Sequence, residues 1–134
     1  MTYRIVNPEA LGRPRGWNHG MLAESGGRVL FVAGQTASDV DGPVEEGFVA
    51  QFRVALERVV AVVREAGGGP AHIGRMTIYV SNMDTYLESR KPLGEAYRAV
   101  MGQHYPAMAL VEVSRLTEPD TMVEIEATAV LPDA

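Results

Sequence analysis

The feature that most constrains this chain lies near its C-terminus, where residues 105–129 have a strong strand-like pattern. Residue types with high β-propensity occupy 107–113, and the turn-forming cluster Thr-Glu-Pro-Asp follows at 117–120. Strand-like alternation then resumes over 122–130. These features predict a hairpin of two strands in this part of the chain.

The second of these segments alternates between two kinds of side chain. A strand period of two places Val123, Ile125 and Ala127 on one face, and Glu124 and Glu126 on the other. We therefore expect one face of this strand to pack in the core and the other to present carboxylates.

The other elements follow from periodicity and from the positions of glycine and proline. Residues 47–66 have apolar side chains at intervals of three and four, which predicts an amphipathic helix that ends at glycines 67–69. The remaining predictions are an edge strand at 1–6, a loop at 7–16, a strand pair at 17–23 and 29–33, a surface loop at 37–46, a strand at 73–80, a short turn at 84–88 and a second helix at 92–102.

This order of elements predicts one α+β domain spanning residues 1–134, built on a mixed six-stranded sheet with two helices on one face. Two helices leave the other face of such a sheet uncovered. On the strand at 107–113, Met108 and Leu110 point away from the face that bears Ala109 and Val111. Because an exposed apolar face is typical of an interface, we expect the chain to self-associate.

Composition argues against several classes of partner. The formal net charge of −5 provides no basic surface for phosphate backbones, so we expect no nucleic-acid partner. There is no cysteine, which excludes disulfides and thiol catalysis. The N-terminus lacks a secretory pattern and no apolar run is long enough for a bilayer, so we expect a cytoplasmic protein without a membrane span. His19, His72 and His104 have no ligand-like spacing, and we expect no metal or cofactor.

Several short motifs occur together in one order. They are FVAGQ at 31–35, RMTIYV at 75–80, YPA at 105–107, VEV at 111–113, RL at 115–116 and VEIEA at 123–127. This set resembles the Rid family (reactive intermediate deaminases, also called RidA/YjgF-like or, by an older label, endoribonuclease L-PSP), whose C-terminal signature is YPAR-x-x-VEV-x-RLP followed by VEIEA. The resemblance covers nearly the whole chain.

The resemblance implies a chorismate mutase-like fold and a barrel-like homotrimer with three clefts between subunits. In such a family, water attacks the C=N carbon of a 2-imino acid and releases ammonia, an arginine holds the substrate carboxylate, and a glutamate positions the water. The matching glutamate here is Glu124. The position of the arginine is occupied by Met108, whose thioether cannot form a bidentate pair with a carboxylate.

The resemblance also implies which residues line the cleft. Trp17 matches a pocket-lining tyrosine, Asn18 and His19 replace small and amide residues, and Gly34 matches a position where backbone contacts ligand. The site predicted from these matches consists of Trp17, Asn18, His19, Gly34, Met108 and Glu124, converging at one subunit boundary on the helix-free side of the sheet.

Each of these residues has an alternative, purely structural interpretation. Trp17 could be a core aromatic residue, His19 an exposed strand residue, and Gly34 a strand-end glycine. Glu124 could be a solvated or interfacial carboxylate paired with a base such as Arg115. In an apolar pocket without a matched arginine, Glu124 would instead have a raised pKa, which suits proton transfer.

Two functions follow as hypotheses. The first is a hydrolase or deaminase acting on a small imine or enamine without a carboxylate clamp, with Glu124 and His19 as proton-transfer groups. The second is a non-catalytic trimer that binds a small metabolite or a partner. We expect no ordinary 2-iminopropionate deaminase activity, unless another cation such as Arg15 or Arg90 takes the place of the missing arginine.

Overall fold

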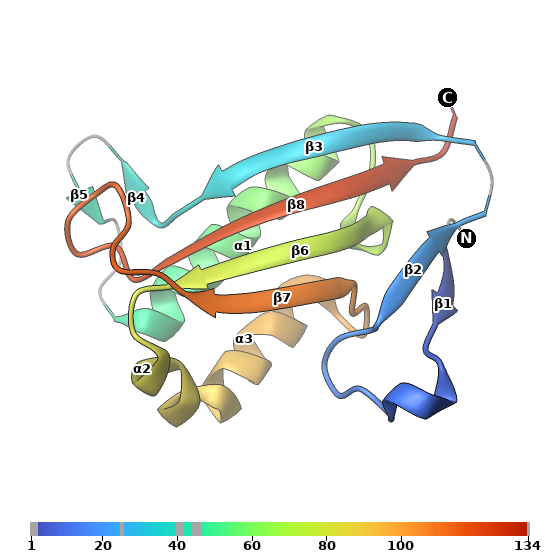
Figure 1. Cartoon of the computed structure of the whole chain (residues 1–134). Helices are drawn as coiled ribbons and strands as arrows, with labels where there is room; N and C mark the ends of the chain where they lie inside the picture. The colour runs from blue at the N-terminus through green and yellow to red at the C-terminus, as the bar shows by residue number, and fades with distance from the viewer. Residues whose placement is uncertain (1–2, 25, 40–41, 44–46, 134) are drawn as a thin grey trace.

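A computed structural model describes residues 3–24, 26–39, 42–43 and 47–133 (Figure 1). The elements in chain order are β1 (Tyr3–Val6), β2 (Gly20–Ala23), β3 (Arg28–Gln35), β4 (Ser38–Asp39), β5 (Gly42–Pro43), α1 (Phe48–Glu65), β6 (Ile73–Val80), α2 (Met83–Glu88), α3 (Arg90–Met101), β7 (Ala107–Glu112) and β8 (Val123–Leu131), with short 3-10 turns at Glu9–Leu11 and Pro70–His72. The loop predicted at 37–46 lies partly outside the described residues.

The two predicted helices are confirmed, together with the strand between them. In α1 the apolar stripe is fully buried at Leu56, Val59 and Val63. The helix ends at Glu65, and Gly67 follows the C-cap residue with a φ of 95°, left-handed backbone that glycine adopts without a steric penalty. The second helical segment divides as predicted: Asn82 Oδ1 accepts from the Thr85 N–H to cap α2, and α3 follows after Ser89.

The central sheet has the strand order β3-β8-β6-β7, with β6 and β7 parallel and the other neighbours antiparallel. The predicted C-terminal hairpin is therefore wrong, because β6 lies between β7 and β8. Around the end of β6, the Val113 N–H donates to the Val80 carbonyl and the Ser81 N–H donates to the Met122 carbonyl. The segment that joins β7 to β8 is longer than a tight turn, so it can pass over the end of a third strand.

The N-terminal strand pairing also differs from the prediction. β2 pairs with β1 as a separate two-stranded antiparallel sheet, while β3 pairs with β8. The segment before β2 is joined to β7 by an isolated bridge between Asn18 and Ala107. Among the described residues the central sheet thus has four strands instead of six. Although β2 precedes β3 in the chain, β3 pairs with the longer strand β8 and not with β2.

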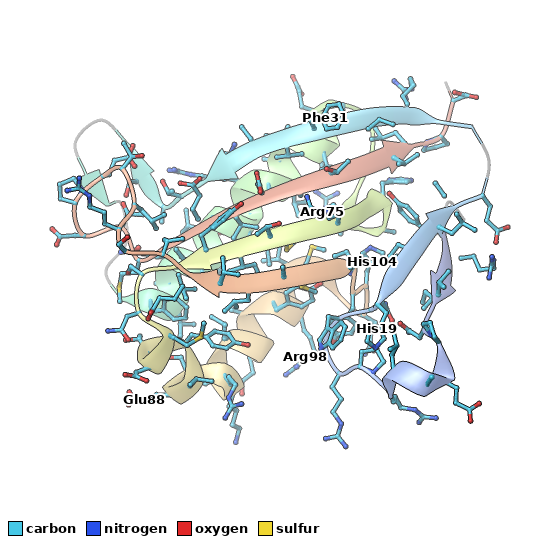
Figure 2. All side chains as sticks on the ribbon, in the orientation of Figure 1. His19, Phe31, Arg75, Glu88, Arg98 and His104 are labelled. Carbon is cyan, nitrogen blue, oxygen red and sulfur yellow. The ribbon has the colours of Figure 1, made fainter. Side chains whose placement is uncertain are left out.

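Helices α1 and α3 cover one face of this sheet, and the opposite face carries no helix (Figure 1). The alternation predicted for β8 is confirmed: Val123, Ile125 and Ala127 are buried, and Glu124 and Glu126 are half-buried on the other side. The uncovered face includes large apolar side chains, with Phe31 79%, Val29 55% and Val111 41% exposed. Figure 2 shows Phe31 on this face.

No helix in the described part of the chain is both long enough and apolar enough to cross a membrane.

Candidate functional site

A cavity with a volume of about 630 Å³ lies between β7, α3 and the loop before β2. Its floor is apolar, formed by Phe52 of α1, Ile78 of β6 and Leu110 of β7. This volume is within the range of about 300–1,000 Å³ that is usual for small-molecule pockets. The cavity is therefore the strongest candidate for a ligand site.

Aromatic rings form much of the wall. Tyr97 and Tyr105 stack with their ring centroids 5.3 Å apart and an interplanar angle of 7°, and both line the cavity with Trp17 and Tyr86. The Tyr97 hydroxyl donates to the His104 carbonyl at 2.6 Å. Burial raises the pKa of Tyr97 far above its ordinary value, so this phenol stays protonated. It acts as a fixed wall and not as a proton donor or acceptor for chemistry.

The segment at 17–19 is fastened to the start of β7 by hydrogen bonds. The Asn18 N–H donates to the Pro106 carbonyl at 3.1 Å, and the Asn18 side-chain amide donates to the Tyr105 carbonyl. Asn7 accepts from the His19 N–H at 2.7 Å and donates to the Asn18 side chain at 2.8 Å. Residues 17–19 are thus held at a defined place although they lie in a loop.

The rings of Trp17 and His19 meet edge to face, with centroids 4.6 Å apart. Trp17 is 38% exposed and lines the main cavity beside Met108, so it is not a core residue. A smaller hollow of about 190 Å³ is lined by Trp17, Asn18, His19 and Met108 together with Arg75. The structure therefore brings together four of the six predicted site residues.

The other two predicted residues, Gly34 and Glu124, form a second group. A side chain at position 34 would collide with the Glu124 carboxylate, since an added Cβ would lie 2.8 Å from its Cδ. A side chain at position 34 would therefore fit only if the Glu124 carboxylate moved aside. Gly34 sits at an irregularity in the pairing of β3 with β8, between Val32 and Gln35.

Burial raises the pKa of Glu124, and the nearby carboxylates of Glu118 and Glu126 raise it further. Among the described residues Glu124 is in no ion pair, so the alternative interpretation, in which a base such as Arg115 pairs with it within one chain, is not supported. The direction of the pKa shift agrees with the sequence prediction, and burial is its main cause, with two neighbouring carboxylates adding to it. A carboxyl group of this kind retains a proton more readily than an ordinary glutamate.

Within one chain the two groups lie apart. Met108 pairs with Met76 and shares its helix-covered side, whereas Glu124 pairs with Tyr79 on the open face. With a rise of about 3.3 Å per residue and about 4.8 Å between strands, their backbones are on the order of 14 Å apart. The expectation that Met108 lies on the helix-free side is wrong, because in the parallel register it continues the row of a core methionine.

Sequence reasoning did not identify Tyr86, Tyr97 and Arg98 as residues of the cavity. One signal was available: Arg90, Gly94 and Arg98 recur every four residues, which places them along one side of a helix. In the described part of the chain, no cluster of three histidine, aspartate or glutamate side chains is arranged to hold a metal ion.

The fold and this cavity define an α+β protein with one layer of helices, an uncovered mixed sheet and a cavity of small-molecule size at the sheet edge. The family model for endoribonuclease L-PSP matches residues 9–131. The chain belongs to this family, which is also known as the Rid or RutC family.

Individual relatives are similar over most of their length. A RutC family protein of Pyrococcus horikoshii is 34% identical over 105 residues, which cover 77% of this chain and 79% of the relative. The crystal structure of YyfB from Yersinia pestis, a Rid family protein of unknown function, has a TM-score of 0.84 at 32% identity and covers 98% of this chain and 100% of that one. TdcF of Escherichia coli, crystallised with bound serine, has a TM-score of 0.66 at 27% identity over 89% of this chain and 91% of its own.

Proposed function

We propose that this protein hydrolyses the C=N bond of a small imine, or of the imine tautomer of a small enamine, in clefts between the subunits of a homotrimer. The observation that carries the proposal is the raised pKa of Glu124, a half-buried carboxyl group that faces the uncovered side of the sheet. Family membership supports it, since TdcF binds a small amino acid. The exposed apolar side chains on the same face support self-association.

In the proposed reaction Glu124 acts first as base and then as acid. Its carboxylate accepts a proton from water as the water oxygen bonds to the imine carbon. The same carboxyl group returns that proton to the nitrogen, which gives a carbinolamine. It then takes the hydroxyl proton of the carbinolamine and passes it to the nitrogen, the C–N bond breaks, and ammonia and a carbonyl compound leave. A raised pKa favours this exchange because a base and an acid are both most effective when the pKa is near the working pH.

The trimer is part of the proposal because it would bring the two groups of residues together. In one chain Glu124 and the Trp17–Met108 pocket lie on different faces of the sheet. A neighbouring subunit packed on the uncovered face could present its Glu124 to the pocket edge. His19, which contacts Trp17, is the candidate for a second proton-transfer group.

The alternative function is binding without turnover. It is favoured by one observation: in the described structure, no aspartate, glutamate or histidine lines the main cavity. If the Glu124 of a neighbour does not reach the cavity, the site has apolar and cationic groups but no general base.

The test is ammonia release from imines generated in situ, including neutral imines and 2-iminopropionate. We expect turnover of a carboxylate-free imine, and a loss of about 10²–10⁴-fold in Glu124→Gln, the usual contribution of general acid–base catalysis. Glu88→Gln is the control, because Glu88 lies at the end of α2 and is not among the groups that raise the pKa of Glu124. Equal activity of Glu124→Gln and the parent would refute the catalytic role, and saturable binding without turnover would establish the alternative.

A further inference from the structure

Three arginines lie at the cavity and no acidic residue accompanies them. Arg15, Arg90 and Arg98 all line it, while no aspartate or glutamate does so among the described residues. The described residues also form no ion pair with any of the three. In a chain with a net charge of −5, such a local excess of positive charge is a specific feature of this cavity.

Two of the arginines are arranged along one side of α3 with a glycine between them. Arg90, Gly94 and Arg98 follow at intervals of four, so their positions stack on the helix surface. The Arg98 guanidinium folds back over Gly94, where an added Cβ would lie 3.2 Å from its Nη1. The Arg90 Nε–H donates to the Leu87 carbonyl at 3.2 Å, which leaves its terminal nitrogens available.

The body of the cavity has the opposite character. Its floor of Phe52, Ile78 and Leu110 is apolar, and the stacked Tyr97 and Tyr105 rings form one wall. A small imino acid would leave most of a cavity of about 630 Å³ empty. The position at which the family resemblance expects a carboxylate clamp is occupied by Met108, which adds another apolar surface.

We propose that this cavity binds an amphipathic anion: an aromatic or branched apolar body inside, and a carboxylate held at the mouth by Arg90 and Arg98 with Arg15 nearby. Guanidinium groups form forked hydrogen bonds with carboxylates, and aromatic bodies fit walls of stacked rings. The inference rests on the proposed function only in using the same pocket. It changes the substrate class from small imines without a carboxylate to larger apolar ones that carry an anion away from the reacting carbon.

Figure 2 labels Arg98 and His19, which both appear below β7 in this view. Arg98 lines the cavity, and His19 contacts Trp17, which lines the same cavity. Trp17 is the only tryptophan of the chain. Its fluorescence therefore reports directly on occupation of this cavity.

The experiment titrates the full-length protein with 3-phenylpropionate, the corresponding amide, 3-phenylpropylamine and propionate, using Trp17 fluorescence and calorimetry. We expect 3-phenylpropionate to bind about tenfold more tightly than the amide, since the contact is charge-assisted but partly solvent-exposed. The amine and propionate should bind more weakly still, because one is repelled and the other has no apolar body. Added salt should weaken the binding of 3-phenylpropionate and leave that of the amide unchanged.

Variants locate the anion. Arg98→Gln and Arg90→Gln should each reduce the affinity for 3-phenylpropionate about threefold to tenfold and leave the amide unaffected. Arg53→Gln is the control, since Arg53 lies on α1 and pairs with Glu57 at 2.9 Å. Equal affinities for the acid and the amide, or equal losses in all three variants, would overturn the proposal. Binding as expected without any C=N hydrolysis would refute the proposed reaction alone, and hydrolysis of small neutral imines without preference for the acid would refute the anion site alone.

Discussion

Replacing Gly94 with alanine should stabilise the protein and weaken its pocket at the same time. Gly94 lies inside α3 with ordinary helical backbone, and glycine in a helix interior is about 0.5–1 kcal/mol less favourable than alanine. The only close neighbour of the new methyl group is Arg98 Nη1 at 3.2 Å, the far end of an exposed side chain that can move by a few tenths of an ångström. Steric strain should therefore offset little of the gain.

The expected net effect on the free energy of unfolding is a rise of about 0.5–1 kcal/mol. For a chain of 134 residues the entropy of unfolding is about 0.3 kcal/mol/K near the midpoint, so Tm should rise by about 2–4 °C. The methyl group also displaces Arg98 from its place over position 94. Binding of 3-phenylpropionate should weaken by about the same factor as in Arg98→Gln.

The assay is urea unfolding of the parent and Gly94→Ala, followed by circular dichroism at one protein concentration, because self-association makes the midpoint depend on concentration. The same two proteins are then titrated with 3-phenylpropionate. A lower midpoint would show that Arg98 cannot move aside and would refute the reasoning on stability. A higher midpoint with unchanged affinity would show that the guanidinium over Gly94 has no part in binding.

Three further outcomes are expected. Folding raises the pKa of Glu124, so this group stabilises the folded state below the unfolded pKa of about 4.3, and that stabilisation is lost as pH rises through the folded pKa. At neutral pH, Glu124→Gln should therefore unfold at a higher urea concentration than the parent. Near pH 4 the two proteins should unfold at the same urea concentration. Phe31→Asp, which changes a side chain that is 79% exposed, should sediment near the single-chain mass of 14.5 kDa while the parent sediments near three times that mass; an unchanged assembly would place the interface elsewhere. Leu56→Ala, at a fully buried position, should lose about 2–5 kcal/mol, and a loss near zero would show that α1 does not form the core in solution.

Local pattern was sufficient for most elements of this protein. The intervals of apolar residues predicted α1, and alternation predicted which side of β8 is buried, because both depend only on the periods of a helix and a strand. Pro92, which cannot lie deep inside a helix, also predicted the break between α2 and α3. The motifs at 105–107 and 123–127 were sufficient for the family.

Strand partners and the composition of the pocket were decided only by tertiary structure. β7 and β8 follow one another in sequence and were expected to pair, but β6 lies between them. Strand pairing depends on which strand edges the fold places side by side, and the local sequence does not contain this information. That register places Met108 among core side chains and away from Glu124. The arginines at 15, 90 and 98 come from a loop and a helix far apart in sequence, and their common cavity exists only because α3 packs beside the loop that Asn18 fastens to β7.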